Sequence, residues 1–201
     1  KELGANMSDL KLYSYFRSSS AYRVRIGLNI KNLPYEIIPI HLLKNGGEQH
    51  APSYRALNPS EQVPTLMDDN YTIGQSLAIL EYIEQKFPHI PLLPQEPFAQ
   101  AIVRQMCEII NSGVQPLQNL MVTQYLTNTL NISEEDKDKW LQFWVSRGLS
   151  SFEVLLEKYA GTFCFGDHAS FADCFLIPQV FSAQRFNVDL SLFPKIKEIN
   201  N

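Results

Sequence analysis

Apolar positions in the first ninety residues of this chain follow two different spacings. Strand-like runs lie at 10–15 (LKLYSY), 35–40, 64–67 (PTLM) and 71–73, and the last two flank the turn Asp68-Asp69-Asn70. Helical spacing fills 21–30 and 76–86, and Ser76 stands in the position of a capping residue. The pattern therefore predicts an α/β unit in the order strand, helix, strand, short helix, strand, strand, helix.

A proline-rich segment follows this unit. Its four prolines are Pro88, Pro91, Pro94 and Pro97. Proline lacks an N–H group and has a fixed φ, so a segment this dense in proline does not continue a helix. Beyond it, helical spacing fills 98–125, 133–159 and 170–186, without strand-like alternation. We expect an α/β domain at 8–87, a linker at 88–96 and an all-helical domain at 97–201.

Composition and charge narrow the range of partners. The 201 residues are 45% hydrophobic and 19% charged, which is typical of a globular protein. A net charge of −4 supplies no positive field for nucleic acid, and no run approaches the roughly 18 apolar residues of a membrane span. We therefore expect a small-molecule substrate, with no nucleic acid and no membrane as partner.

The cysteines and histidines show no pattern of a metal or disulfide site. Cys107, Cys164 and Cys174 are odd in number, widely spaced and without a CxxC pair, and the four histidines have no common ligand spacing. We expect buried thiols, no metal and a cytoplasmic location. At the other end, we expect Met7 to be a native start and Lys1–Asn6 to be residues left from cloning, with an ordinary disordered N-terminus as the alternative.

The triplet Ser18-Ser19-Ser20 stands between a predicted strand and a predicted helix. The first turn of a helix has unpaired N–H groups and the positive end of the helix dipole, so this position favours an anion. The simpler interpretation is that one serine only caps the helix. The residues by themselves favour the cap.

A longer stretch carries a resemblance to a known family. Residues 13–28 (YSYFRSSSAYRVRIGL) resemble the signature of the zeta class of the cytosolic glutathione transferases, usually written SSCxWRVRIAL. Further matches are LNPSEQVPTL (57–66), QSLAILEY (75–82), QPLQNL (115–120), FADCFLIPQ (171–179) and RFNVDL (185–190). Ser20 departs from the cysteine of many relatives, Tyr22 replaces tryptophan, and we expect relatives to continue beyond Asn201.

The resemblance implies a fold and a cofactor. The expected fold is an N-terminal thioredoxin-like α/β domain with an all-α C-terminal domain, and the cofactor is glutathione. Ser18 is the first candidate to donate a hydrogen bond to the glutathione thiolate, Ser19 is the second, and Ser20 is a neighbour or cap. The family also implies a homodimer.

Further site residues come from the same resemblance. Val63-Pro64 is expected to form a cis peptide bond that turns the Val63 backbone toward the cysteinyl part of glutathione. Gln75 and Ser76 are expected to hold the γ-glutamyl carboxylate, although Ser76 fits a plain helix cap as well. The remaining candidate glutathione contacts are Arg23, Gln49, Gln115 and Asn119. Gln115 could instead be a core residue whose amide is hydrogen-bonded within the protein. Arg23 could instead have a structural role.

Two arginines are candidates for the second substrate. The arginine matching Arg185 in the family faces the active site and is proposed to hold a substrate carboxylate, while the alternative is a surface charge near a helix C-terminus. Arg17 lies closer to the serines and adds positive potential. Asp173, in the sequence Ser170-Phe171-Ala172-Asp173, has the spacing of a capping box and is assigned to folding.

The characterised zeta-class members are maleylacetoacetate isomerases. The resemblance therefore implies a glutathione-dependent cis–trans isomerase that converts maleylacetoacetate to fumarylacetoacetate in the breakdown of phenylalanine and tyrosine. One alternative is a general glutathione transferase or α-halo-acid dehalogenase on the same scaffold. Another is a non-catalytic glutathione-transferase-like binding protein, which the presence of Ser18, Gln75 and Ser76 argues against.

Overall fold

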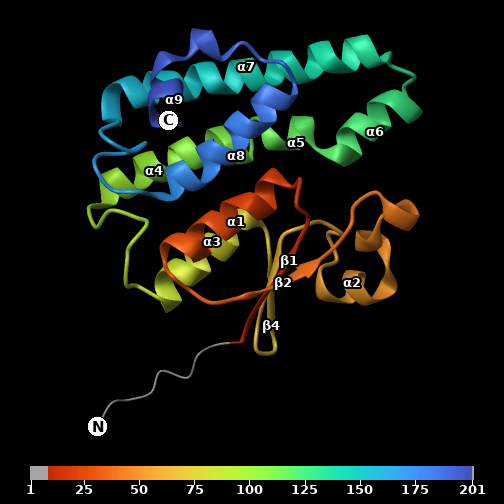
Figure 1. Ribbon diagram of the computed structural model, residues 1–201, viewed down its shortest axis with the longest axis horizontal. Helices are drawn as coiled ribbons and strands as arrows, with labels where there is room; N and C mark the ends of the chain where they lie inside the picture. Colours follow the sequence, from red (N-terminus) through yellow and green to blue (C-terminus); the bar gives the residue numbers. More distant parts are fainter. Residues whose placement is uncertain (1–8, 201) are drawn as a thin grey trace. The chain divides into compact units, whose positions relative to one another are not determined.

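The chain folds into two compact units that divide between Ile90 and Pro91. The computed structural model describes residues 9–200 (Figure 1). The N-terminal residues that we attributed to cloning lie outside the described residues. The domain and linker boundaries expected from the sequence remain predictions.

A mixed four-stranded sheet forms the centre of the first unit. Its strands are β1 (Leu10–Ser14), β2 (Glu36–Pro39), β3 (Thr65–Asp68) and β4 (Tyr71–Gly74), in the order β2-β1-β3-β4. β1 runs parallel to β2 and antiparallel to β3, and β4 pairs antiparallel with β3. In the register, Leu12 lies between Ile37 on one side and Leu66 on the other. The predicted strand order along the chain is confirmed.

Two helices cover one face of this sheet. α1 (Ser19–Ile30) and α3 (Ser76–Lys86) pack against each other (Figure 1) and bury Val24, Leu28, Ile79 and Leu80. Leu12 is fully buried and points to the same face, because side chains along a strand alternate. The hydrophobic spacing seen in the sequence is the spacing of this core.

The short α2 (Pro52–Leu57) contacts β1 through an aromatic pair. The ring of Tyr54 meets the ring of Tyr13 edge-on, with centroids 5.8 Å apart, and Tyr54 forms a buried cluster with Tyr15 and Val63. Two 3₁₀ turns, η1 (Lys44–Gly46) and η2 (Glu48–His50), precede α2. This cluster fixes the backbone around Val63 against the end of β1.

Two details of the capping prediction are corrected. α1 begins at Ser19 and not at residue 21, because the Ser18 side chain caps it. α3 begins at Ser76, but Ser76 is its first helical residue and not its cap. The cap position belongs to Gln75, whose backbone has φ 68° and whose side chain makes no capping hydrogen bond. The Ser76 hydroxyl is used elsewhere, as described below.

The second unit is helical. Its helices are α4 (Pro97–Asn111), α5 (Gln115–Gln118), α6 (Leu120–Asn128), α7 (Glu134–Tyr159), α8 (Phe171–Arg185) and α9 (Pro194–Ile199), with the 3₁₀ turn η3 at Leu190–Leu192. α8 packs on α4, and α7 contacts α9. α8 is buried along almost its whole length, which explains its even distribution of apolar residues.

The helical structure predicted for 98–125 is present, but the spacing did not show that this segment is divided. The segment forms three helices, because α4 ends at Ser112-Gly113, Pro116 opens the short α5, and Asn119 caps α6. η3 and α9 were not predicted. The capping box is confirmed: Asp173 accepts the backbone N–H of Ser170 at 2.7 Å and its hydroxyl at 2.9 Å.

All three cysteines are buried in the second unit and form no disulfide bond among the described residues. Burial raises the pKa of the Cys164 thiol well above its usual range, and the nearby Asp173 carboxylate adds to this. Within residues 9–200, no helix is both long and apolar enough to cross a bilayer.

Candidate active site

Ser18 occupies the turn between β1 and α1. Its Oγ accepts the backbone N–H of Ala21 at 3.1 Å, and its own N–H donates to the carbonyl of Tyr15 at 3.0 Å. A hydroxyl that accepts one hydrogen bond still has its proton to donate. Both interpretations of the sequence therefore apply to Ser18. Its hydroxyl oxygen caps α1, and its hydroxyl proton is a hydrogen-bond donor at the positive end of that helix.

The neighbouring serines have different positions. Ser19 and Ser20 are the first two residues of α1, and both side chains are half-buried. Of the three hydroxyls, that of Ser18 makes the cap.

The Val63–Pro64 peptide bond is cis, as the family resemblance implied. Two side chains hold the segment on either side of it. The Tyr54 hydroxyl donates to the carbonyl of Gln62 at 2.5 Å and lies 2.8 Å from the Thr65 hydroxyl, while Asn58 donates to both groups at 2.9 Å. Among residues 9–200, the backbone N–H and carbonyl of Val63 have no hydrogen-bond partner. Tyr54 and Asn58 thus hold the segment, and the backbone groups of Val63 are left available for pairing.

Arg23 connects α1 with the start of α3. Its Nη1 donates to the Ser76 Oγ at 3.0 Å, and both side chains are buried. Since the Ser76 oxygen accepts from Arg23, the Ser76 proton is available to a different acceptor. Gln75 is exposed and directly precedes the first N–H groups of α3, which is the end of a helix that attracts a carboxylate.

Gln49 is buried in η2 with part of its amide unsatisfied. Its Nε2 lies 3.4 Å from the carbonyl of Leu42 and 3.0 Å from the Nε2 of His50. Its Oε1 is buried and has no hydrogen-bond partner among the described residues. A buried carbonyl oxygen without a donor is costly, so this oxygen suits a ligand that brings an N–H group.

The sequence motifs did not reveal which side chains support the site. Tyr54 and Asn58, which hold the cis segment, were not predicted, although both lie in or next to the motif at 57–66. Their role depends on contacts across the turn that no local spacing encodes.

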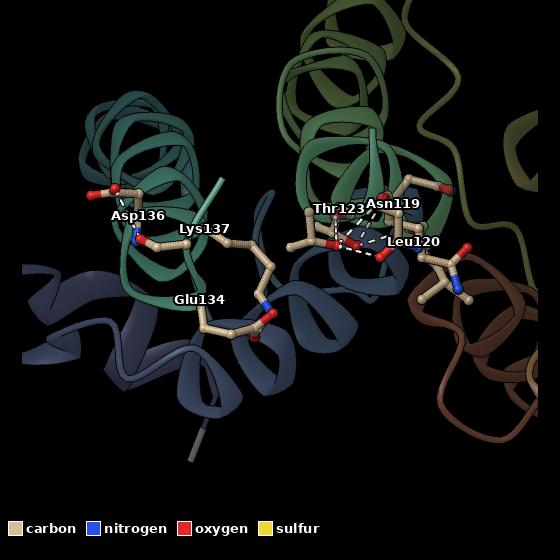
Figure 2. Close-up of polar contacts among 10 residues, drawn as sticks. Asn119, Leu120, Thr123, Glu134, Asp136 and Lys137 are labelled. Atoms are coloured by element: carbon tan, nitrogen blue, oxygen red, sulfur yellow. Dashed lines mark hydrogen bonds and ion pairs between the residues drawn. The ribbon is translucent and has the colours of Figure 1, made fainter. Parts of the chain in front are cut away.

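Gln115, Asn119 and Arg185 lie in the second unit. Gln115 is the half-buried first residue of α5. Asn119 caps α6, because its Oδ1 accepts the N–H of Met121 at 2.9 Å. Figure 2 shows the Thr123 hydroxyl directed at the carbonyls of Asn119 and Leu120, which it reaches at 3.3 and 3.0 Å. The Asn119 amide nitrogen is left for another acceptor.

A pair of buried amides holds α5 in place. Gln118 and Gln179 exchange two hydrogen bonds, of 3.2 and 2.9 Å, between α5 and α8. Gln179 is fully buried. This reciprocal pair orients the short segment that carries Gln115 and Asn119.

The two substrate candidates are exposed arginines. Arg185 lies in the last turn of α8 with its guanidinium carbon 5.7 Å from the centre of the Phe186 ring. Arg17 lies just before Ser18, 5.4 Å from the centre of the Phe16 ring. Neither forms an ion pair with another residue in the described part of the chain. Both charges are therefore available to an anion.

The comparisons with known proteins agree with this arrangement. Residues 12–96 match the glutathione S-transferase N-terminal domain. The maleylacetoacetate isomerase of Rattus norvegicus is 49% identical over 189 residues, which is 94% of this chain and 85% of the rat protein. A solved bacterial maleyl pyruvate isomerase, a zeta-class glutathione S-transferase, superposes with a TM-score of 0.91 at 37% identity over 94% of this chain and 90% of that one. The chain belongs to the zeta class of the glutathione S-transferases.

The family explains the two-unit fold and the choice of candidate residues. The maleylacetoacetate isomerase of Anaeromyxobacter dehalogenans 2CP-1, solved with glutathione in its active site, has a TM-score of 0.85 at 40% identity and covers 96% of this chain and 89% of that one. The first unit is thus a thioredoxin-like domain and the second is the helical domain of this family, as predicted.

The residues present fit glutathione as a bound group. The Ser18 proton, the unpaired Val63 backbone, the Ser76 proton and the buried Gln49 Oε1 form a set of donors and acceptors that suits a peptide with a thiol and carboxylates. Among residues 9–200, no group of three or more His, Cys, Asp or Glu side chains is placed to hold a metal ion.

Proposed function

We propose that the protein is a glutathione-dependent cis–trans isomerase that converts maleylacetoacetate to fumarylacetoacetate. The proposal is supported by a match at 49% identity to 85% of the length of a maleylacetoacetate isomerase and by the polar groups of the first unit. The observation that carries it is the Ser18 hydroxyl, which caps α1 and retains a proton at the positive end of that helix.

Ser18 stabilises negative charge on sulfur. Bound glutathione supplies a nucleophilic thiol whose reversible addition to a conjugated double bond lets that bond rotate. The Ser18 Oγ–H donates a hydrogen bond to the charged form of this thiol, and the N-terminus of the 12-residue α1 adds its dipole. Both effects lower the thiol pKa, so more of the nucleophile is present at neutral pH.

The start of α3 anchors the other end of the cofactor. The Ser76 hydroxyl is oriented by Arg23, which leaves its proton to donate, and the first N–H groups of α3 point the same way. Gln75 adds an amide. These groups bind a carboxylate without taking part in bond rotation, so they govern the affinity for glutathione rather than the rate of chemistry.

Arg185 and Arg17 are proposed to hold the substrate carboxylates. A guanidinium binds a carboxylate through two parallel hydrogen bonds, which fixes both position and direction. Since the alkene must lie within reach of the thiol, this orientation contributes to the rate through proximity.

The decisive experiment measures turnover of maleylacetoacetate with and without glutathione. We expect isomerisation only with glutathione, and no net consumption of glutathione over many turnovers. Consumption of one glutathione per product would favour the general transferase, and release of halide from α-halo acids at a higher kcat/KM would favour the dehalogenase. Weak retention on glutathione resin together with no turnover would favour the non-catalytic binding protein.

A second substrate is favoured by one of the comparisons. The bacterial relative with a TM-score of 0.91 is a maleyl pyruvate isomerase. Maleylpyruvate should therefore be assayed beside maleylacetoacetate under the same conditions. The ratio of the two kcat/KM values decides which substrate the protein prefers.

A homodimer in the cytoplasm is also proposed. The family resemblance supports the dimer, and three buried cysteines without a disulfide bond among the described residues suit a reducing compartment. Light scattering is expected to give twice the chain mass of 23.0 kDa, and a single-chain mass would contradict the dimer. Fractionation of the source cells would test the location.

A further inference from the structure

A pocket of about 300 Å³ opens in the first unit, between α1 and the edge strand β2. Its wall is largely apolar and comes from Phe16, Ile37, Pro39 and Ile40. Phe16 is 68% exposed and Ile37 is 50% exposed, which is unusual for large apolar side chains beside a cavity. Within residues 9–200, none of the glutathione candidates lines this pocket. It is therefore distinct from the set of glutathione candidates, although Phe16 in its wall also contacts Arg17.

Arg25 brings a positive charge to the pocket. Its side chain is half-buried, its Nη1 donates to the Ser14 hydroxyl at 2.8 Å, and its guanidinium carbon lies 5.1 Å from the centre of the Tyr22 ring. No carboxylate of the described chain forms an ion pair with it, and no Asp or Glu of that part of the chain lines the pocket. Burial lowers the pKa of Arg25, which shows that its charge is partly desolvated.

The position of this arginine is held by the fold. Ser14 is a buried residue at the end of β1, and the hydrogen bond from Arg25 ties the guanidinium to that strand, in a pocket that residues of β2 also line. A guanidinium held in this way keeps other N–H donors in a fixed fork. Because its charge is not neutralised by the protein, an anion that enters the pocket gains a charge-assisted hydrogen bond.

His41 supplies a second donor. Its Nδ1 accepts the backbone N–H groups of Leu43 at 3.2 Å and Lys44 at 2.9 Å, so the neutral ring carries its proton on Nε2. The ring packs edge-on against Tyr15 with centroids 5.1 Å apart. The pocket thus combines the Arg25 cation and the polar side chains of Ser14 and His41 with a largely apolar wall.

We propose that this pocket binds a small carboxylate with a flat apolar body, whose carboxylate meets Arg25 and whose body lies against Phe16, Ile37 and Ile40. A drug-sized pocket with a few polar groups in an apolar wall is the usual form of a small-molecule site. The occupant would contact Tyr15 and Phe16, and the carbonyl of Tyr15 accepts the N–H of Ser18. The site therefore adjoins the backbone that carries Ser18 without using the glutathione groups.

The test measures binding of benzoate and of its neutral isostere benzamide to the full chain, by calorimetry and by backbone amide NMR. Benzoate is expected to bind at least about tenfold more tightly, because only it has a charge for Arg25. The amide signals that move should be those of Ser14, Phe16, Arg25 and residues 37–41. Movement confined to residues around Ser76 or Arg185 would overturn the proposal.

Two variants and one control test whether the charge of Arg25 binds the carboxylate. Arg25→Gln is expected to weaken benzoate binding about tenfold or more and to leave benzamide within about twofold. Ile37→Glu, on the exposed edge strand, places a negative charge at the pocket and is expected to act in the same direction. Arg147→Gln removes an exposed arginine of α7 and should leave both ligands unchanged. If Arg25→Gln does not fold by circular dichroism, Ile37→Glu decides alone.

A final titration separates this site from the glutathione site. At saturating glutathione, the dissociation constant for benzoate should change by less than about twofold, because the two ligands use different residues. A rise in proportion to the glutathione concentration would show that benzoate occupies the glutathione site and would refute the proposal. Equal affinity for benzoate and benzamide would refute it too. No step of this test uses turnover, so its outcome is independent of the proposed isomerase activity.

Discussion

Replacement of Ser18 by alanine removes two interactions that depend on one oxygen. The Oγ accepts the N–H of Ala21 at 3.1 Å, and loss of such a helix cap costs about 1 kcal/mol of folding free energy. The same change removes the proposed hydrogen bond to the glutathione thiolate. A hydrogen bond to a charged group contributes about 1.5–3 kcal/mol, so kcat/KM should fall roughly 10- to 150-fold.

Two further substitutions separate the cap from the donor. Ser18→Asp keeps a side-chain acceptor for the Ala21 N–H, but at neutral pH it has no proton to donate and adds a negative charge beside the sulfur. Ser18→Thr keeps both the acceptor and the donor. We expect the melting temperature to fall by about 2–4 °C in the alanine variant and to change little in the other two. We expect kcat/KM to fall in the alanine and aspartate variants, with threonine closest to wild type.

The assay combines initial rates of isomerisation with a pH titration of bound glutathione by ultraviolet absorbance of the thiolate. Without the Ser18 donor, the pKa of the bound thiol should rise by about 1–2 units, which moves the acid limb of the kcat/KM profile to higher pH. Wild-type kcat/KM in Ser18→Asp would refute the reasoning. Equal losses in Ser19→Ala and Ser20→Ala would also refute it, since those residues lie inside the helix.

Three other predictions address affinity, substrate choice and stability. Ser76→Ala should raise KM for glutathione about tenfold with little change in kcat, measured by initial rates, because it deletes a carboxylate donor oriented by Arg23; a loss confined to kcat would contradict this. Arg185→Leu should raise KM for maleylacetoacetate more than about tenfold while conjugation of a neutral electrophile survives; equal loss of both activities would remove its assigned role. Hydrogen bonds from His50 and, to a lesser extent, Arg55 hold the pKa of Glu61 in the folded protein below its ordinary 4.5. Ionised Glu61 therefore stabilises the fold at pH values above 4.5, and this contribution is lost as the pH falls through the lower pKa of the folded state. Glu61→Gln should therefore lower the melting temperature at neutral pH but not in acid below that pKa, and an equal deficit at both would exclude the ionic cause.

Short-range features of this protein follow from its sequence. The strands β1 to β4, the helix α3 and the capping box at Ser170 and Asp173 were predicted close to their observed positions, because each depends on spacing or hydrogen bonds within one or two turns of chain. The zeta-class signature likewise lies in one continuous stretch. The Val63–Pro64 cis bond was expected from that resemblance alone and is present.

The division of the segment 98–125 shows where local reasoning fails. Its apolar residues keep a helical spacing throughout, so the pattern gives no sign of where one helix ends and the next begins. The structure ends α4 at Ser112-Gly113 and caps a new helix with Asn119. The free-energy difference between capping a helix and continuing it is small. The packing of neighbouring helices therefore decides where a helix ends.

Tertiary structure alone decided what the polar side chains of the site do. Ser76 was predicted to cap α3, but Arg23, 53 residues earlier in the chain, takes its oxygen and leaves its proton for a ligand. No motif in the sequence marks Arg25 as part of a site, and only the placement of β2 beside α1 gives its charge a pocket. The spacing of residues along the sequence determines which of them share a face of a helix or strand. Which distant side chain meets a given hydroxyl depends on how those faces pack, and that is set by the whole core at once.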